Sequence, residues 1–233
     1  MREIVGTWDL VIFDNDGVLV DSEPLANRVL AGLLTEHGYP ISPEQCVRRF
    51  MGRTLATVRA AVEDETGTPL PADFESAYYD VLFEEFRRSL RRVAGVEAVL
   101  ATLERDGTPV CVASSARHEK IRVSLDVAGL AHHFGDRVFS AQDVRRGKPA
   151  PDLFLHAAAN CGVEPERCLV IEDSPPGIRA AKAAAGMTAI GYVGLIPADQ
   201  LVEAGADIVI DTMDRLLDAM AQLSPDTARH VVE

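Results

Sequence analysis

The chain has 233 residues and an acidic composition, with a formal net charge of −13 and a pI near 4.9. This length suffices for one large α/β domain, or for a core domain with a smaller insert, and for a substantial buried core. The negative charge argues against a nucleic acid or an anionic membrane as partner, because no broad basic surface is available to neutralise phosphates. Any phosphate that the protein binds must therefore be held by a few local groups.

The first residues and the cysteines both indicate a cytoplasmic protein. The apolar run in MREIVGTWDLVIFDND is too short for a signal sequence, and no later segment approaches the length that spans a membrane. Cys46, Cys111, Cys161 and Cys168 are widely spaced and form no CxxC pair. We expect reduced thiols that pack among apolar neighbours, in preference to disulfides, zinc ligands or nucleophiles.

A short apolar segment, residues 10–13, runs directly into two carboxylates, Asp14 and Asp16. The segment is too short for an ordinary helix and fits a strand buried on both faces of a parallel sheet. Such strands present ligands at their carboxyl ends, and side chains two residues apart point the same way. Asp14 and Asp16 can therefore converge on one cation or phosphoryl group, while Gly17 lets the backbone turn away. An ordinary turn is the alternative, because Asp and Gly are common turn residues.

Residues 22–92 carry helical patterns without a convincing strand. The first helix is predicted to begin at Ser22–Glu23–Pro24 and to end at Gly38, and prolines and glycines break the later patterns. A parallel sheet that continued directly would need strands here. We therefore expect residues 22–92 to form a separate, all-helical insert within a core made of residues 1–21 and 93–233.

From Gly95 onward, helical patterns alternate with short apolar strands. Helices are predicted near residues 96–106, 117–128, 151–161, 176–185 and 213–222, and strands at 109–114, 138–140, 168–173, 188–193 and 206–211. Together with the first strand, this alternation predicts an α/β fold with a doubly wound parallel, Rossmann-like sheet as its core.

Polar residues follow two of the later strands and could complete a site with Asp14 and Asp16. Ser114 and Ser115 end the second strand, where a hydroxyl and backbone N–H groups could hold phosphate oxygens; a plain helix cap is the alternative. Glu172 and Asp173 end the strand that begins at Cys168. Two acids at the end of a buried strand are costly without a partner, which favours a metal site, since hard divalent ions take carboxylate oxygens.

Lys148 lies between these two strand ends in the sequence, within GKPAPD and ahead of a helix. A glycine and two prolines would hold this loop in a defined shape. The lysine could then neutralise both a phosphate and the carboxylates as a compact point charge.

Four segments occur in the order FDNDG (13–17), VASS (112–115), GKPAPD (147–152) and VIEDSPPG (170–177). Their types and order resemble the four motifs of the haloacid dehalogenase superfamily of phosphohydrolases and phosphomutases, over nearly the whole chain. The helical insert matches the position of the small helical cap of that family. Within the superfamily, the first and last segments look most like the β-phosphoglucomutase-like subgroup.

The resemblance implies a role for each motif residue. Asp14 would be the nucleophile that forms an aspartyl-phosphate, and Asp16 the general acid and base. Ser114, helped by Ser115, would bind the phosphoryl group, and Lys148 would stabilise the charge of the transition state. The implied cofactor is Mg²⁺, held by Asp14, by the backbone carbonyl of Asp16, by Asp173 and by Glu172, the last directly or through water.

The resemblance also implies that the cap closes over the site and selects the substrate. Gly52 matches a cap glycine that permits close approach of the substrate. Arg53 beside it could contact a sugar hydroxyl, a carboxylate or a distal phosphate, and an exposed arginine without a ligand is the alternative.

Two activities are compatible with these motifs. β-Phosphoglucomutase has a histidine at the position of Ala26, and a cap arginine and lysine at Leu55 and Met51; these departures favour a phosphatase over a mutase. We predict a Mg²⁺-dependent phosphatase that acts on a small phosphorylated sugar, sugar alcohol or sugar acid, with a sugar phosphomutase as the alternative. A non-catalytic protein that binds a phosphorylated metabolite is a third possibility. The sequence does not decide between monomer and dimer, and we favour a monomer.

Overall fold

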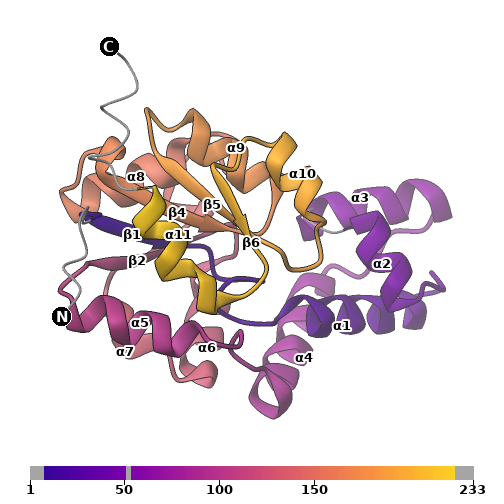
Figure 1. Cartoon of the computed structure of the whole chain (residues 1–233). Helices are drawn as coiled ribbons and strands as arrows, with labels where there is room; N and C mark the ends of the chain where they lie inside the picture. Colours follow the sequence, from indigo (N-terminus) through magenta and orange to yellow (C-terminus); the bar gives the residue numbers. More distant parts are fainter. Residues whose placement is uncertain (1–7, 51–53, 224–233) are drawn as a thin grey trace. The chain divides into compact units, whose positions relative to one another are not determined.

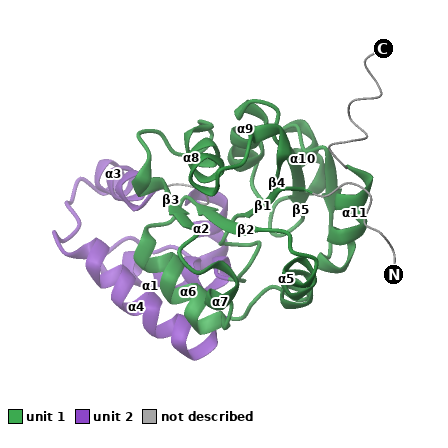
Figure 2. Cartoon of the chain, turned by 90° about the vertical axis from the view of Figure 1, so that its left-hand side faces the viewer, with its two compact units in different colours: residues 1–21, 91–233 green, residues 22–90 purple. Residues whose placement is uncertain are grey.

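The computed structural model describes residues 8–50 and 54–223. The chain divides into two compact units, residues 1–21 with 91–233 and residues 22–90, which Figure 2 shows in green and purple. We call them the core unit and the helical unit.

Within the described residues, the core unit contains one six-stranded parallel sheet with the strand order β3-β2-β1-β4-β5-β6 (Figure 1). The strands are β1 Leu10–Phe13, β2 Val110–Ser114, β3 Val138–Ser140, β4 Cys168–Glu172, β5 Thr188–Tyr192 and β6 Ile208–Ile210. The direction in which strands are added reverses between β1 and β4. Ligands bind at such a switch point, outside the carboxyl ends of the strands. The predicted doubly wound parallel fold is confirmed.

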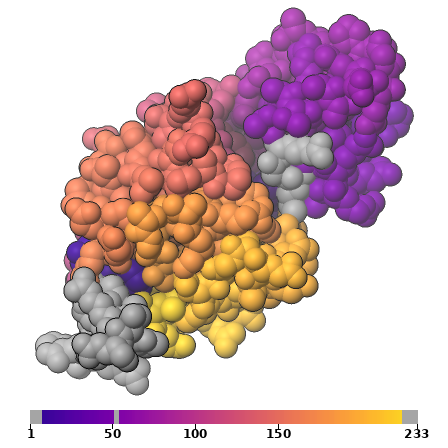
Figure 3. All heavy atoms as spheres, turned by 90° about the horizontal axis from the view of Figure 1, so that it is seen from above, coloured from indigo at the N-terminus to yellow at the C-terminus, as the bar shows by residue number. Residues whose placement is uncertain are grey.

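Helices cover both faces of the sheet. Their bounds are α5 Val96–Arg105, α6 His118–Ala128, α7 Ala131–Phe134, α8 Asp152–Cys161, α9 Pro175–Ala183, α10 Ala198–Glu203 and α11 Leu216–Gln222, with 3₁₀ turns η1 Ala141–Asp143, η2 Pro165–Arg167 and η3 Met213–Arg215. The helices α8, α9 and α10 lie side by side over one face (Figure 1), and Figure 3 shows the surface of the molecule on that side. The other face carries α5, α6 and α7 (Figure 1).

The central strand β1 is fully buried on both faces. Because alternate side chains of a strand point to opposite faces, Leu10 and Ile12 join the apolar cluster that includes Phe154 of α8. Phe13 points the other way and meets the ring of Phe134 on α7 edge-on, at 6.5 Å between ring centroids. Each such buried side chain contributes roughly 1.5–3 kcal/mol, so the strand that carries the site is anchored from both sides.

The helical unit contains α1 Glu23–Glu36, α2 Pro43–Phe50, α3 Leu55–Thr66 and α4 Phe74–Ser89, and no strand among its described residues. Its core includes Leu34, Phe74, Leu82 and Phe86, each at most 2% exposed. Pro24 stands in the first turn of α1, where its missing N–H costs nothing. Gly67 ends α3 in the left-handed conformation that glycine adopts without strain.

The chain returns to the core unit after Leu90, slightly before the boundary at residue 92 that the sequence indicated. Backbone pairing explains the difference. Asp21 N donates to Arg91 O at 2.9 Å, and Val20 forms an antiparallel bridge with Arg92. These residues therefore belong with the segment that follows β1.

The predicted helices and strands of the core unit are present, with ends that differ by a few residues. The helices α7 and α10 were missed, and the last predicted helix begins as the 3₁₀ turn η3. All four cysteines lie in the described ranges, and Cys46, Cys111 and Cys168 are buried; that they stay reduced in the cell remains a prediction. Among the described residues, no helix combines the length and apolar character needed to cross a bilayer.

Candidate active site at the carboxyl ends of β1 and β4

The end of β1 places Asp14 in the interior. Asp14 N donates to Ile171 O at 3.0 Å, so the pairing with β4 continues one residue past the strand, and Asp14 is 6% exposed. The chain then turns back on itself, because Leu19 N and Val20 N both donate to Asn15 O. Asp16 lies within this turn and is less buried than Asp14. The Asp16 carboxylate lies close enough to raise the pKa of Asp14.

Lys148 joins three elements around Asp14. Its Nζ donates to Asp14 Oδ1 at 2.7 Å, to Glu172 Oε1 at 2.7 Å and to Ala113 O, in β2, at 3.0 Å. The side chain is 4% exposed, and its ammonium lies 4.9 Å from the ring centroid of Phe154. All three ammonium hydrogens are therefore used, and the lysine links the ends of β1, β2 and β4.

Glu172 is held on both of its oxygens. Oε1 accepts from Lys148, and Oε2 accepts from the backbone N–H and the hydroxyl of Ser174, each at 2.8 Å. A Cβ at Gly177, in the first turn of α9, would lie 1.8 Å from Glu172 Oε1, so the carboxylate is packed directly against that glycine. These contacts indicate that the main role of Glu172 is to position Lys148. Its predicted contact with a metal stays a prediction.

The Asp173 carboxylate packs against Gly17, in the turn after β1, and not against Gly177 as Glu172 does. A Cβ on Gly17 would lie 2.0 Å from Asp173 Oδ2, and Gly17 has a φ of +79°. Glycine is required here on both counts, because it avoids the overlap and adopts this backbone conformation without strain. The Asp173 carboxylate therefore lies across the turn that carries Asp16, whereas the adjacent Glu172 faces Lys148.

Ser114 and Ser115 differ in exposure. Ser114 ends β2, is 1% exposed, and its Oγ accepts from Ala116 N at 3.1 Å. A hydroxyl that accepts in this way can still donate its own proton to a second group. Ser115 is exposed. The loop is fixed from β3, because Ser140 Oγ donates to Ala116 O at 2.7 Å.

Lys120 was missed by the sequence analysis. It lies in the first turn of α6, and its Nζ is 2.8 Å from Asp16 Oδ1, with both side chains less than 15% exposed. A lysine on an amphipathic helix is ordinarily solvated and carries no signal. One feature could have identified Lys120 as a site residue. It lies in the first turn of the helix that follows the strand ending in Ser114.

The electrostatics of the site are dominated by acids. Burial raises the pKa of Asp14 to about 7, and the carboxylates of Glu172 and Asp16 act in the same direction, against the ammonium of Lys148. Burial acts to lower the pKa of Lys148, but Asp14 and Glu172 outweigh it, so this pKa is raised. Near neutral pH, Asp14 is thus poised between its acid and its carboxylate, and a nearby cation would favour the carboxylate.

The donor set fits a hard divalent cation. Four carboxylates (Asp14, Asp16, Glu172 and Asp173) face two ammonium groups, which leaves two negative charges when all six are ionised. The oxygens of Asp14 and Asp173 come from adjacent strands, and Mg²⁺ prefers such oxygen ligands. These two residues and the backbone carbonyl of Asp16 are the groups that could hold it.

The predicted cap residues cannot be placed in the site. Gly52, Arg53 and Met51 lie outside the described residues. Ala26, at the position of the mutase histidine, lies within α1 and offers no side chain that could transfer a proton.

Known proteins resemble the chain over most of its length. A family model of haloacid dehalogenase-like hydrolases matches residues 8–185. The 6-phosphogluconate phosphatase of Escherichia coli K12 is 32% identical over 173 residues, which are 74% of this chain and 77% of that protein.

Two solved structures resemble the chain in both sequence and fold. A conserved haloacid dehalogenase-like protein of unknown function from Agrobacterium tumefaciens is 41% identical, with a TM-score of 0.79 over 93% of this chain and 99% of that chain. A hydrolase of the same family from Deinococcus radiodurans, solved with bound phosphate and sodium, is 31% identical, with a TM-score of 0.77 over 93% of this chain and 96% of that chain.

Proposed function

The chain belongs to the haloacid dehalogenase-like hydrolases, and we propose that it is a Mg²⁺-dependent phosphatase that hydrolyses a small phosphorylated sugar, sugar alcohol or sugar acid. One observation carries the proposal. The Asp14 carboxylate lies buried at the switch point of the sheet and is held by Lys148, which is itself fixed by Glu172 and Ala113. A nucleophile in a fixed position with a cation beside it is the arrangement that phosphoryl transfer requires.

In the first step, an oxygen of Asp14 attacks phosphorus in line, and the bond between phosphorus and the leaving oxygen breaks. Asp16 donates its proton to that oxygen, which leaves as the alcohol. In the second step, Asp16 takes a proton from water, the water oxygen bonds to phosphorus, and the bond to Asp14 breaks. Inorganic phosphate is released, and both aspartates return to their initial states.

Four groups support these steps. Lys148 and the Ser114 hydroxyl stabilise the phosphoryl oxygens, with Ser115 as an auxiliary donor, and Lys120 holds the Asp16 side chain. Mg²⁺, when bound by Asp14, Asp173 and the Asp16 carbonyl, neutralises charge on the phosphoryl group and on the nucleophile. Because Ser174 and Lys148 engage both oxygens of Glu172, its first role in this proposal is to position Lys148, and a contact with the metal, direct or through water, would be additional.

The substrate class rests on the relatives and on the sequence of the helical unit. A relative that is named as a 6-phosphogluconate phosphatase makes a sugar acid phosphate the first compound to test. Gly52 and Arg53 remain the predicted contacts to the part of the substrate that does not react. A cytoplasmic location and a monomeric state also remain predictions of the sequence.

Phosphate release tests the proposal, measured with Mg²⁺ and with chelator across phosphorylated sugars, polyols, sugar acids and phosphoglycolate. We expect Mg²⁺-dependent release from a few related compounds, and loss of at least about 10³-fold in Asp14→Asn. Asp9→Asn is the matched control, because Asp9 precedes the same strand at its opposite end and pairs with Arg167. Isomerisation of a hexose 1-phosphate without release would identify a mutase, and binding without turnover a non-catalytic protein.

A further inference from the structure

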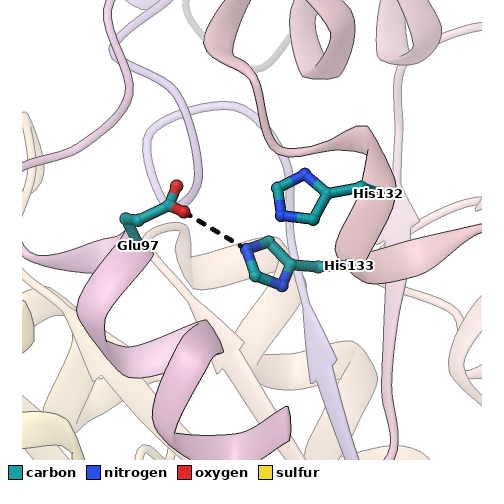
Figure 4. Close-up of side chains that lie close together, drawn as sticks. All are labelled: Glu97, His132 and His133. Atoms are coloured by element: carbon teal, nitrogen blue, oxygen red, sulfur yellow. Dashed lines mark ion pairs between the residues drawn. The ribbon is translucent and has the colours of Figure 1, made fainter.

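A second group of ionisable side chains lies on helices α5 and α7 of the core unit, apart from the candidate active site. Glu97 stands in the first turn of α5, and His132 and His133 stand on α7. One ligand atom from each of the three lies within 4.8 Å of the others. Figure 4 shows Glu97 reaching from its helix toward His133, with the ring of His132 beside the gap between them. None of these residues serves in the proposed phosphatase mechanism.

The two histidine rings converge, although they are neighbours in sequence. Their centroids lie 3.9 Å apart, with 38° between the ring planes. Adjacent residues of a helix ordinarily point in different directions. The short α7 thus presents two imidazoles to one place.

Among the described residues, buried polar atoms of His133 and Glu97 lack hydrogen bonds, whereas His132 is exposed. The side chain of His133 is 3% exposed, and neither of its ring nitrogens has a hydrogen-bond partner among the described residues. Glu97 Oε2 is also buried and has no hydrogen-bond partner among the described residues, although it forms an ion pair with Arg92 Nη1 at 3.2 Å. Buried polar atoms without partners are costly and uncommon, so each calls for a ligand or a proton.

Each nitrogen of His133 faces a different carboxylate. Nε2 lies 3.5 Å from Glu97 Oε1, and Nδ1 lies 3.3 Å from Glu104 Oε2, two turns further along α5. Histidines that bind metals commonly donate their second N–H to a carboxylate, which fixes the ring and strengthens the ligand. Glu104 is the carboxylate that Nδ1 faces and would serve as such an acceptor, which would leave Nε2, on the side of Glu97, as the atom that binds a metal.

We propose that Glu97, His132 and His133 bind one divalent transition-metal ion, with Zn²⁺ as the representative. Two imidazoles and one carboxylate form a donor set that suits zinc, whereas Mg²⁺ prefers oxygen ligands throughout. Zinc lies about 2 Å from each ligand, so the three atoms must draw closer than 4.8 Å, and rotation of the exposed His132 supplies that movement. Water completes the coordination, and the ion joins α5 to α7 across one face of the sheet.

Zinc titration of the whole chain in saturating Mg²⁺ tests this proposal, because Mg²⁺ occupies the acidic site at β1 and β4. We expect binding of one Zn²⁺ per chain, at least tenfold weaker binding in His132→Gln and in Glu97→Gln, and a cobalt absorption spectrum that His132→Gln changes. His132 is exposed, so its substitution leaves the core intact, and circular dichroism checks this. His156→Gln, on α8, is the matched histidine control and should bind like the parent.

Two results would overturn the proposal. Equal zinc affinity in the parent, His132→Gln and Glu97→Gln would place the ion elsewhere. No zinc binding by the parent would mean that the unpaired ring nitrogens of His133 do not mark a metal site. Phosphate release by His132→Gln should equal that of the parent, so this test and the test of the phosphatase can fail independently.

Discussion

Two groups of buried ionisable side chains in the core unit differ in how completely their polar atoms are paired. At the ends of β1 and β4, Lys148 donates three hydrogen bonds, and Ser174 supplies two more to Glu172. At α5 and α7, both nitrogens of His133 and one oxygen of Glu97 lack hydrogen bonds to described residues.

The difference bears on what each group can do. A network whose donors are all used holds its reacting atoms in place before the substrate arrives, so little reorganisation is left for the reaction. A cluster with unpaired buried atoms instead gains stability when a ligand or a proton arrives. We therefore propose catalysis for the first group and the binding of a transition-metal ion for the second.

The largest expected effect comes from removing the ammonium at the centre of the paired network. Lys148→Met leaves Asp14 and Glu172 buried without their cation, which should lower the free energy of unfolding by about 3–5 kcal/mol. Phosphate release should fall by about 10²–10³-fold, because the positive charge beside the nucleophile and the transferring phosphoryl group is lost. Denaturant unfolding and steady-state kinetics measure the two effects.

Lys182→Met is the control for that substitution. Lys182 pairs with Asp207 at 2.7 Å, but both side chains are about one-third exposed, so the loss should stay within about 1 kcal/mol. Equal destabilisation by the two substitutions would mean that the burial of the Lys148 network makes no difference to the free energy of unfolding.

A pair of glycine substitutions tests the packing behind Glu172. Gly177→Ala places a methyl group 1.8 Å from Glu172 Oε1, which should displace that carboxylate, destabilise the fold by about 1–3 kcal/mol and reduce turnover. Gly32→Ala makes the same change within helix α1, where nothing lies within 4 Å, and should stabilise by about 0.5–1 kcal/mol. Thermal or denaturant unfolding measures the change in unfolding free energy and shows whether each substitution destabilises or stabilises the fold. A stabilising Gly177→Ala would contradict the described position of Glu172.

Lys120 should act through Asp16. Lys120→Met should lower kcat/KM about tenfold, equivalent to about 1.4 kcal/mol, and should lower the free energy of unfolding by less than Lys148→Met does, because Lys120 and Asp16 are less deeply buried than the Lys148 network. Lys120→Arg keeps the charge and should recover most of the activity, which a merely structural role would not require. Full activity in Lys120→Met would remove this lysine from the site.

The smallest expected effect concerns the loop that supports Ser114. Burial opposes ionisation of Asp143, but hydrogen bonds from His118 and from Ser140 N outweigh it and lower the pKa of Asp143. A lowered pKa stabilises the fold above the unfolded-state value of about 3.9 and loses that contribution as the pH falls through the lower, folded-state value. Asp143→Asn should therefore cost stability at neutral pH and nothing in strong acid.

Urea unfolding at several pH values measures this effect, with Asp126→Asn on the exposed side of α6 as control. A pH-independent cost of Asp143→Asn would show that the carboxylate charge does not matter.

The fold could be predicted from the sequence to the extent that its strands are buried on both faces. Residues 10–13 and 168–172 form continuous apolar runs that lead into acids, and these runs are too short for an ordinary helix. The sequence analysis missed the helices α7 and α10 because they have four and six residues, too few to show the helical period twice.

The site was predictable as a set of residues but not as a set of contacts. The sequence indicated Asp14, Lys148 and the acids after β4, yet it treated Glu172 and Asp173 as one metal-binding pair. The structure separates them, since neighbouring residues of a strand point to opposite sides, and Glu172 is held by Lys148. Contacts between elements that are distant in sequence, such as Lys120 of α6 with Asp16 in the turn after β1, or Glu97 of α5 with His133 of α7, depend on packing that no local pattern encodes.

The most direct test of the central claim is rapid-quench detection of phosphate on Asp14 during turnover of a substrate labelled at phosphorus. We expect the label on the peptide that contains Asp14 in the parent and none in Asp14→Asn. Turnover by the parent with no label on that peptide at any time, or with label on another residue, would contradict the assignment of Asp14 as the nucleophile.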